Sequence, residues 1–406
     1  MNVTINKGKA HGTIIAPPSK SVAHRMLICG GLANAKSTIT GINNSEDVKA
    51  TLDCLSAIGV QYTHTGDVLE ITGREVKKNK QIQEFFCRES GATLRFFIPL
   101  ALLTGKKSIF YGTQNLLSRP LSVYQGICKE QDLMFVKEKD RIILEGPLKA
   151  GNFKVQGNIS SQFVSGLLFA LPVLKKDSQI SITQPIESHS YIDLTLHVMR
   201  KFGMKIEWKN ERTLYIPGGQ KYSPLNGTVE GDYSNASFFA ALNVLGGDVT
   251  INGLDENSVQ GDKIFSKYFD MIKRGTPSIN ISDCPDLGPI LFALAAANNG
   301  GVFTGTRRLK LKESDRGEAM AEELRKFGAI VTVNEDEIVV FPKEFHRPTE
   351  VLNGHNDHRV VMALAILCTI FGGEIEGAEA VNKSFPDFFE KLQSVGIEVT
   401  KHTNEV

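Results

Sequence analysis

Cationic and hydroxyl-bearing side chains stand at the predicted start of the first apolar helix. Lys20 lies between Ser19 and Ser21, directly before that helix, and Arg25 follows one turn later. Serine is an ordinary helix cap, but a cation at a helix start opposes the partial positive charge of the helix dipole. An anionic ligand would offset this repulsion, because helix starts bind phosphates and carboxylates. The segment therefore predicts an anion site that involves Lys20, Ser21 and Arg25.

Further predicted helix starts carry the same kinds of residue. They are Glu89-Ser90-Gly91-Ala92-Thr93, Asn158-Ile159-Ser160-Ser161-Gln162, Lys312-Glu313-Ser314-Asp315-Arg316, Asn356-Asp357-His358-Arg359 and Asn382-Lys383-Ser384. Arg119, in a Ser- and Asn-rich loop, precedes a further helix. Single basic residues on loops are usually solvated, but their recurrence at corresponding loops predicts a pocket for small, multiply charged anions.

Most of these loops also have a plain structural interpretation. Ser160 and Ser161 could simply cap a helix, the charges of residues 312–316 could form a solvated cluster, and Asp286 could be an N-cap. The charges of residues 357–359 are different, because they enter an apolar helix. Such burial is costly unless a ligand or a partner meets the charge. We therefore favour a functional role for this segment.

No metal or organic cofactor is expected. His355 and His358 could form a metal-binding pair, but no third ligand lies at a useful spacing. Residues 30–37 approach a phosphate-binding loop, yet Ala35 stands where the second glycine belongs, and the segment follows a helix rather than a strand. No Gly-x-Gly-x-x-Gly motif follows a predicted strand either, so nucleotide cofactors have no support.

The composition is that of a globular protein of more than one domain. The chain has 406 residues, 41% of them hydrophobic, and a net charge of +1 from 46 basic and 45 acidic residues. This balance argues against a dedicated nucleic-acid binder. The longest apolar stretch, near residues 360–371, is too short to span a bilayer. The first residues lack the apolar core of a signal peptide, and the cysteines are scattered, so we expect a cytoplasmic protein with reduced thiols.

Two patterns alternate along the chain with a period of about 70 residues. The first is an apolar helix rich in small residues, followed by a turn and a strand, in residues 22–39, 92–109, 162–182, 236–251, 288–303 and 360–375. The second is an amphipathic helix that ends at or near glycine, followed by strands, in residues 48–60, 122–135, 193–206, 263–275, 319–331 and 386–399. Each pair predicts a β-α-β-α-β-β unit, and the fourth unit is compressed because a single short strand (residues 278–281) follows its amphipathic helix.

Six such units exceed one hydrophobic core, so the pattern predicts an α/β protein of two domains with three units each. The turn-forming residues 217–224 predict the boundary between the two domains. We expect one domain over residues 17–224. The other is discontinuous, over residues 1–16 plus 225–406, because the first strand completes the second half. The two crossings would form a hinge, which is a natural place for a ligand.

The loops taken together resemble the 5-enolpyruvylshikimate-3-phosphate synthase family of enolpyruvyl transferases. The likeness covers the whole chain, and the order and spacing of its motifs are very specific. The matching motifs are Pro17-Pro18-Ser19-Lys20-Ser21 with Arg25, Ser160-Ser161-Gln162-Phe163, Ser188 with Tyr191-Ile192-Asp193, Pro285-Asp286-Leu287, Lys312-Glu313-Ser314-Asp315-Arg316, Asn356-Asp357-His358-Arg359 and Lys383-Ser384-Phe385-Pro386-Asp387.

This resemblance implies a fold and a reaction. The fold is a two-domain inside-out α/β barrel with pseudo-threefold symmetry in each domain and an active site in the interdomain cleft. The reaction transfers the enolpyruvyl group of phosphoenolpyruvate to the 5-hydroxyl of shikimate 3-phosphate in aromatic amino acid biosynthesis, through a tetrahedral intermediate. It needs no cofactor. The expected partners are these two substrates alone, without nucleic acid or membrane, and the expected state is a monomer.

The resemblance also assigns roles. The residues matched to shikimate 3-phosphate binding are Lys20, Ser21, Arg25, Ser160, Ser161, Gln162, Ser188, Asp286 and Lys312. Those matched to phosphoenolpyruvate binding are Lys20, Gly91, Arg119, Gln162, Arg316, Arg359 and Lys383. Asp286 is the candidate base for the attacking hydroxyl, and Glu313, with Lys20 nearby, is the candidate for proton transfer at the methylene carbon. Such roles require shifted pKa values.

Some residues depart from the family pattern, and other interpretations stay open. Glu89 and Ala92 stand in a loop that is usually Asn-Ala-Gly-Thr, which leaves sensitivity to the inhibitor glyphosate undecided, and Arg308 stands where many relatives carry Asn. UDP-N-acetylglucosamine enolpyruvyl transferases share the fold and reaction type, but usually carry a cysteine in a loop that holds none here (residues 113–118). A non-catalytic repeat protein that binds anions would need neither Asp286 nor Glu313.

Overall fold

The computed structural model describes residues 1–76, 82–341, 343 and 345–402. Two compact units make up the chain. We call Lys20–Glu230 the inserted unit, and Met1–Ser19 together with Gly231–Val406 the terminal unit. Each has its own hydrophobic core. These divisions lie a few residues after the boundaries expected from the sequence at residues 16 and 224.

The inserted unit contains three four-stranded sheets with one shared plan. Each sheet has two neighbouring parallel strands followed by an antiparallel hairpin. In sheet order the strands are β14 (Asn226–Thr228), β3 (Lys36–Thr40), β5 (Val68–Thr72) and β4 (Gln61–Thr65); β6 (Gln83–Phe86), β7 (Lys107–Tyr111), β9 (Arg141–Glu145) and β8 (Met134–Lys137); and β10 (Asn152–Gln156), β11 (Ser178–Thr183), β13 (Thr213–Ile216) and β12 (Glu207–Asn210). The predicted repeat is thus a repeat of whole sheets.

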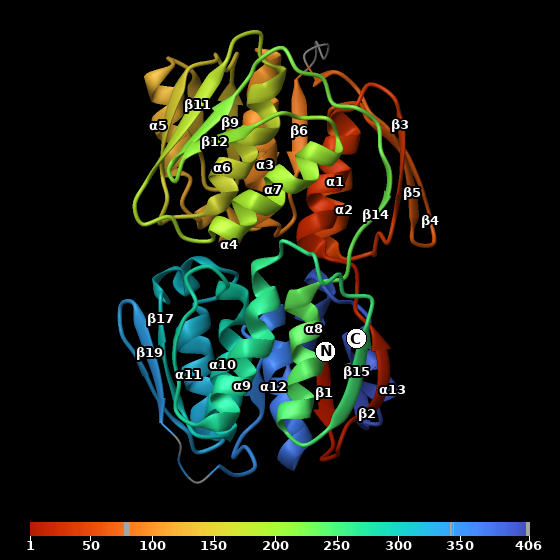
Figure 1. Cartoon of the computed structure of the whole chain (residues 1–406), viewed down its shortest axis with the longest axis vertical. Helices are drawn as coiled ribbons and strands as arrows, with labels where there is room; N and C mark the ends of the chain where they lie inside the picture. The colour runs from red at the N-terminus through yellow and green to blue at the C-terminus, as the bar shows by residue number, and fades with distance from the viewer. Residues whose placement is uncertain (77–81, 342, 344, 403–406) are drawn as a thin grey trace. The chain divides into compact units, whose positions relative to one another are not determined.

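Apolar helices fill the interior of the inserted unit, as the sequence predicted. Its helices are α1 (Lys20–Leu32), α2 (Glu46–Ala57), α3 (Gly91–Ala101), α4 (Gln114–Ser118), α5 (Ser122–Glu130), α6 (Ser161–Ala170) and α7 (His189–Lys201). Nearly every residue of α1, α3 and α6 is buried, and Figure 1 shows these helices between the sheet of β3 to β5 and the strands β9, β11 and β12. A Cβ atom at Gly166 in α6 would lie 2.4 Å from the carbonyl oxygen of Arg95 in α3, so glycine permits the close approach of these two helices.

The terminal unit repeats the plan with one shortened sheet. Its strands, in sheet order, are β20 (Leu352–Asn353), β21 (Gly373–Glu376), β1 (Asn2–Ile5) and β22 (Val399–His402); β16 (Ser278–Asn280), β17 (Gly301–Thr304), β19 (Glu337–Phe341) and β18 (Ile330–Val333); and the two-stranded sheet of β15 (Asp248–Asn252) and β2 (His11–Ile15). The short sheet belongs to the unit that the sequence marked as compressed. The strand after its amphipathic helix, β16, pairs with β17 and so opens the next sheet.

Buried helices also form the centre of the terminal unit. Its helices are α8 (Tyr233–Val244), α9 (Phe265–Arg274), α10 (Gly288–Ala297), α11 (Arg316–Lys326), α12 (His358–Phe371) and α13 (Phe388–Ser394). The first-type helices α8, α10 and α12 are the most buried of these. In Figure 1 they run between β17 and β19 on one side and β1, β2 and β15 on the other. The first-type helices therefore lie inside and the sheets outside, which is an inside-out α/β arrangement.

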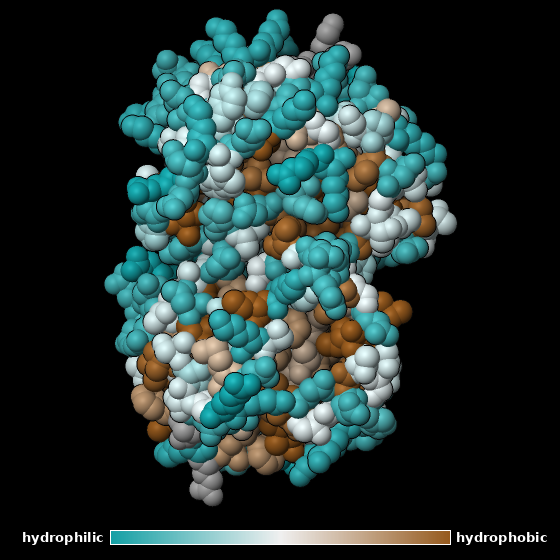
Figure 2. Space-filling view, viewed as in Figure 1, coloured by the Kyte–Doolittle hydropathy of each residue, from teal (hydrophilic) through white to brown (hydrophobic). Residues whose placement is uncertain are grey.

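The outer faces of the sheets carry the exposed side chains. Figure 2 shows hydrophilic residues over most of the visible face, with hydrophobic residues in small patches. Several exposed large hydrophobic residues lie on strands: Ile15, Phe86, Met134, Val136, Ile330 and Phe341. This pattern fits sheets that bury one face and leave the other in solvent. Among the described helices, none combines the length and the apolar character needed to cross a membrane.

Candidate functional site

Three cationic side chains contact the Asp286 carboxylate in the terminal unit. It lies in the short 3-10 helix η5 (Pro285–Leu287), directly before α10. Lys312 Nζ donates to Asp286 Oδ1 at 3.0 Å, and Arg316 Nη1 donates to the same oxygen at 2.7 Å. Arg359 Nη2 lies 3.5 Å from Asp286 Oδ2. A plain helix cap would not gather three cations, so the capping interpretation does not account for this residue.

Arg316 connects Asp286 to two other carboxylates. It is the first residue of α11, whose N-cap is Asp315, and its side chain is only 1% exposed. Arg316 Nη2 donates to Glu313 Oε2 at 2.8 Å, and Nε donates to Asp357 Oδ2 at 2.8 Å. Burial opposes the charged form, but the neighbouring carboxylates of Asp357, Glu313 and Asp286 raise the pKa of Arg316 well above its usual value. The solvated-cluster interpretation therefore fails for this residue.

The start of α12 carries another buried arginine of this unit. Asp357 is the N-cap and accepts a hydrogen bond from the backbone N–H of Arg359 at 2.9 Å. The Arg359 side chain is buried, its Nη1 reaches Asn235 Oδ1 at 3.4 Å, and its Nε has no hydrogen-bond partner among the described residues. An arginine in this state can still donate to an anion.

Lys383 lies elsewhere than the sequence predicted. We expected it at a helix start, but it is the last residue of the 3-10 helix η7 (Ala378–Lys383), several residues before α13 begins at Phe388. The expectation was wrong because Asn-Lys-Ser has the composition of a capping segment. Lys383 is buried, and its Nζ donates to the backbone oxygen of Asn356 at 2.7 Å and to Asn356 Oδ1 at 2.8 Å. It is thus tied to the loop that leads to Arg359.

Burial shifts the pKa values of two further groups in this cluster. Burial, and to a smaller extent the nearby cations, lowers the pKa of Lys312 despite the attraction of Asp286. Burial, followed by repulsion from Asp286, raises the pKa of Asp262 to about 8. Asp262 lies in the 3-10 helix η4 (Gly261–Ile264) and accepts a hydrogen bond from Ser234 Oγ. The cluster therefore holds titratable groups with perturbed protonation, which are common at active sites.

In the inserted unit, Lys20 forms an ion pair with Asp47. It is the first residue of α1, and its Nζ donates to Asp47 Oδ2, in the first turn of α2, at 2.9 Å. Both side chains are largely buried, 15% and 12% exposed. The carboxylate offsets the unfavourable position of a cation at a helix start.

Arg25 is held by neutral oxygens. Its Nε donates to Thr195 Oγ1 at 2.8 Å, its Nη1 to the backbone oxygen of Ser21 at 2.7 Å, and its Nη2 to the backbone oxygen of Tyr191 at 3.1 Å. Burial lowers the pKa of Arg25 to about 10. The guanidinium carbon also lies 5.4 Å from the centre of the Phe96 ring, a cation–π distance. Arg25 therefore keeps a buried positive charge with no acidic partner in these bonds.

Gly91, Arg119 and Gln162 lie together with Arg95. A Cβ atom at Gly91 would lie 2.9 Å from Arg119 Nη1 and 3.2 Å from Arg95 Nη1. Arg95 Nη1 donates to Gln162 Oε1 at 2.7 Å. Arg119 follows the short helix α4 and is buried rather than solvated, and its Nε has no hydrogen-bond partner among the described residues. The structure thus places three of the predicted residues, Gly91, Arg119 and Gln162, beside Arg95.

The predicted serines occupy helix starts. Ser160 is the N-cap of α6 and accepts from the backbone N–H of Gln162 at 3.2 Å, so its capping role is confirmed, while its ligand-binding role stays a prediction. Ser161 is the buried first residue of α6. Ser188, the buried residue before α7, has a left-handed backbone with φ of 55°, and its carbonyl accepts from the N–H of Tyr191, which binds Arg25.

Sequence reasoning missed several residues of these clusters. Arg95 lies in the buried helix α3, and the rule that we applied to Arg359, that a charge in an apolar helix needs a partner, would have found it. Asp47 looked like an ordinary acid in the first turn of a helix, and Asp262 carries no local signal. Of the residues that depart from the family pattern, Glu89 accepts from Thr113 Oγ1 at 3.4 Å, and buried Arg308 donates to the backbone oxygen of Ser282 at 2.9 Å.

The chain matches known proteins along nearly all of its length. A family model described as EPSP synthase (3-phosphoshikimate 1-carboxyvinyltransferase) matches residues 5–392. A 3-phosphoshikimate 1-carboxyvinyltransferase of Clostridium kluyveri is 40% identical over 421 residues, with 98% of each chain covered. One of Clostridium perfringens (strain SM101 / Type A) is 40% identical over 420 residues, with 97% of this chain and 98% of the relative covered. A solved EPSP synthase structure from Acinetobacter baumannii superposes with a TM-score of 0.78 at 23% identity, covering 98% of this chain and 100% of that one, and so shares the fold.

Proposed function

Because the chain belongs to the EPSP synthase (3-phosphoshikimate 1-carboxyvinyltransferase) family, we infer that it transfers the enolpyruvyl group of phosphoenolpyruvate to the 5-hydroxyl of shikimate 3-phosphate. The products are the enolpyruvyl ether and free phosphate, in the shikimate route to aromatic amino acids. The observation that carries this proposal is the cluster in which Asp286 meets Lys312, Arg316 and Arg359. It combines anion-binding cations with a carboxylate that can accept a proton.

The reaction adds and then eliminates. The hydroxyl oxygen of shikimate 3-phosphate bonds to C2 of phosphoenolpyruvate and gives up its proton, while the methylene carbon C3 gains a proton and becomes a methyl group. C3 then loses a proton as the C2–O bond to phosphate breaks. We assign the hydroxyl proton to Asp286 and the C3 proton to Glu313 and Lys20. Residues that hold charge at fixed positions stabilise the tetrahedral intermediate.

Anion binding follows from the buried cations. For shikimate 3-phosphate we propose Lys20, Ser21, Arg25, Ser160, Ser161, Gln162, Ser188, Asp286 and Lys312. For phosphoenolpyruvate we propose Lys20, Gly91, Arg119, Gln162, Arg316, Arg359 and Lys383. Support comes from the burial of Arg25, Arg119 and Arg359, since a buried guanidinium gains from a bidentate phosphate or carboxylate.

The assignment draws on both units, and we propose that groups of both are needed for one turnover. We place the reaction in the cytoplasm, a proposal that rests on six scattered cysteines, all of them free and buried. The expected monomer stays a prediction, which light scattering would test.

The test is a phosphate-release assay with phosphoenolpyruvate and two acceptors, offered separately. Shikimate 3-phosphate should support release, whereas UDP-N-acetylglucosamine should not. Release with UDP-N-acetylglucosamine but not with shikimate 3-phosphate would indicate a UDP-N-acetylglucosamine enolpyruvyl transferase. Absence of release with both acceptors would contradict the enzyme assignment. In the same assay Lys20→Met should keep the fold but abolish turnover. Near-normal turnover of this variant would refute the role of Lys20.

A further inference from the structure

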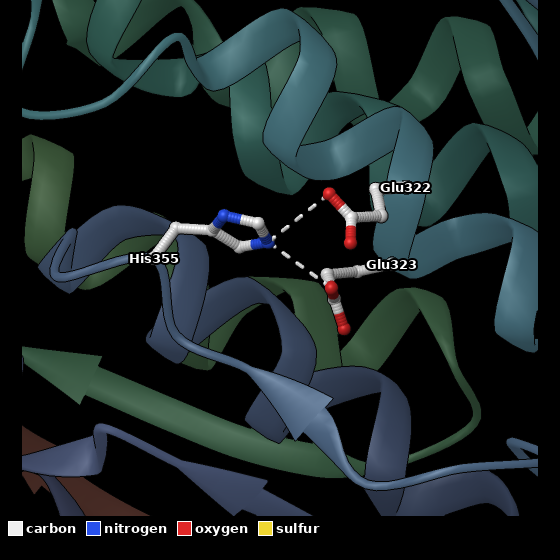
Figure 3. Close-up of side chains that lie close together, drawn as sticks. All are labelled: Glu322, Glu323 and His355. Atoms are coloured by element: carbon white, nitrogen blue, oxygen red, sulfur yellow. Dashed lines mark hydrogen bonds and ion pairs between the residues drawn. The ribbon is translucent and has the colours of Figure 1, made fainter.

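Glu322, Glu323 and His355 bring three possible metal-ligand atoms within 4.8 Å of one another (Figure 3). The sequence offered no third ligand for His355, but folding supplies two from α11. A cation already holds the buried carboxylate of Glu323, however. Lys326 Nζ donates to both of its oxygens, at 3.0 and 2.9 Å. The group is therefore better explained as a hydrogen-bonding centre than as a metal site.

Glu323 binds the segment that precedes α12. Its Oε2 accepts from the backbone N–H of Asn353 at 2.9 Å, and its Oε1 accepts from His355 Nε2 at 3.0 Å. The Glu323 side chain is fully buried, with 0% exposure. Burial disfavours its charge, but the bonds from His355, Lys326 and the Asn353 N–H lower its pKa below the usual value. Glu323 is thus an ionised, buried acceptor with donors from two elements.

The segment that Glu323 binds has an unusual backbone. His355 and Asn356 both have positive φ, 49° and 50°, although neither is glycine. A left-handed backbone at a residue other than glycine is strained and persists only where its surroundings hold it. Besides Glu323, Asn353 Oδ1 accepts from the backbone N–H of His355 at 2.7 Å. The turn therefore depends on side-chain bonds that include those of Glu323.

This turn connects to the proposed phosphoenolpyruvate residues. Asn356 accepts from Lys383 through both its backbone oxygen and its side chain. The next residue, Asp357, binds Arg316 and caps the helix that carries Arg359. Helix α11 thus contacts the segment at two points, through Arg316 at its start and through Glu323 two turns later.

We propose that Glu323 is a positioning residue that fixes the His355–Asn356 turn and, through it, Lys383, Arg316 and Arg359 for phosphoenolpyruvate binding. The inference rests on the proposed function, because those three residues are assigned to phosphoenolpyruvate there. Glu323 itself belongs to neither the proposed binding set nor the proposed catalytic set. A displaced cation binds its substrate less well, and small misplacements are costly in active sites.

The experiment compares Glu323→Gln with Glu322→Gln in the full chain. Glutamine keeps the size of the side chain, but its amide donates where Lys326 and His355 also donate. Glu322 is the matched control, since it is the adjacent residue, its side chain is 61% exposed, and its oxygen lies 3.9 Å from His355 Nε2. We expect Glu323→Gln to raise the KM for phosphoenolpyruvate by about tenfold or more. The KM for shikimate 3-phosphate should stay within about threefold, and Glu322→Gln should leave both constants near wild type.

A second variant covers the case in which Glu323→Gln does not fold. His355→Asn keeps a residue type that tolerates the left-handed backbone but removes the ring that reaches Glu323. It should raise the KM for phosphoenolpyruvate in the same direction and by less, with a melting temperature close to wild type.

The outcomes separate this inference from the proposed function. If the wild-type protein is active but every folded variant keeps the wild-type KM for phosphoenolpyruvate, the positioning role alone is overturned. Equal increases in the KM values of both substrates would overturn it too. Wild-type protein that releases no phosphate would overturn the proposed function and, with it, this inference.

Discussion

Two buried arginines, Arg25 of the inserted unit and Arg316 of the terminal unit, are held by different means. In the inserted unit, Arg25 binds only neutral oxygens, and Arg95 binds the amide of Gln162. In the terminal unit, Arg316 binds three carboxylates, and one of these, Asp286, also meets two other cations.

The difference indicates what each cluster gains from an anion. A guanidinium held by neutral groups keeps its full charge, so an arriving phosphate supplies the missing counterion. A guanidinium surrounded by acids is already neutralised, so an arriving anion competes with them. This competition would release carboxylates from their ion pairs, and a released carboxylate can accept a proton. We therefore propose that Arg25 serves mainly to capture substrate, whereas the acids around Arg316 serve mainly in proton transfer.

The largest expected effect is on turnover. Asp286→Asn removes the proposed base but keeps the shape of the side chain, so kcat should fall by about 10²- to 10⁴-fold. Binding of both substrates should stay within about tenfold, or roughly 1.4 kcal/mol. Steady-state kinetics and calorimetry measure the two quantities. Lost binding with intact chemistry would contradict the role given to Asp286.

Stability should distinguish the two clusters next. Arg316→Met leaves three acids without their shared cation and should cost about 3–5 kcal/mol of unfolding free energy near pH 7.5. Arg25→Met leaves neutral oxygens and should cost about 1–3 kcal/mol. Urea denaturation at this pH measures both, and equal deficits would erase the distinction.

A smaller effect is expected on substrate affinity. Arg25→Lys keeps the positive charge but loses the planar fork that binds a phosphate bidentately. The affinity for shikimate 3-phosphate should fall by about tenfold, or roughly 1.4 kcal/mol, while that for phosphoenolpyruvate changes less. Calorimetric titration with each substrate tests this, and a loss confined to phosphoenolpyruvate would contradict the assignment of Arg25.

The last expected effect concerns pH and Asp262. Its pKa is raised to about 8 in the folded protein, whereas an unfolded aspartate titrates near about 3.9. Between these values the folded state keeps a proton that the unfolded state has lost, so stability falls as the pH rises through this window. Asp262→Asn removes that dependence. The melting temperature of wild type should therefore fall more between pH 5 and pH 8 than that of the variant, and parallel curves would refute it.

The sequence was sufficient wherever a signal is local and repeated. The alternation of apolar and amphipathic helices predicted the elements of both units, because burial imposes hydrophobic periodicity. The strand β14 and the helix α4 were missed, since Asn226-Gly227-Thr228 is polar and Gln114–Ser118 spans hardly more than one turn. The charged residues of the helix starts were found, but their pairing was not. The contacts of Lys20 with Asp47 and of Glu323 with His355 join segments that are distant in the sequence. No local sequence pattern predicts such contacts.

The strand order of the terminal unit has a consequence for synthesis. β1 pairs with β21 and β22 in one sheet, where Val3 lies opposite Ile375 and Lys401. These partners are synthesised long after β1, so β1 stays unpaired while the residues between them are made. The described strands of the inserted unit all lie between residues 36 and 228, so their partners follow much sooner. We therefore expect translation to yield a folded inserted unit while β1 is still unpaired.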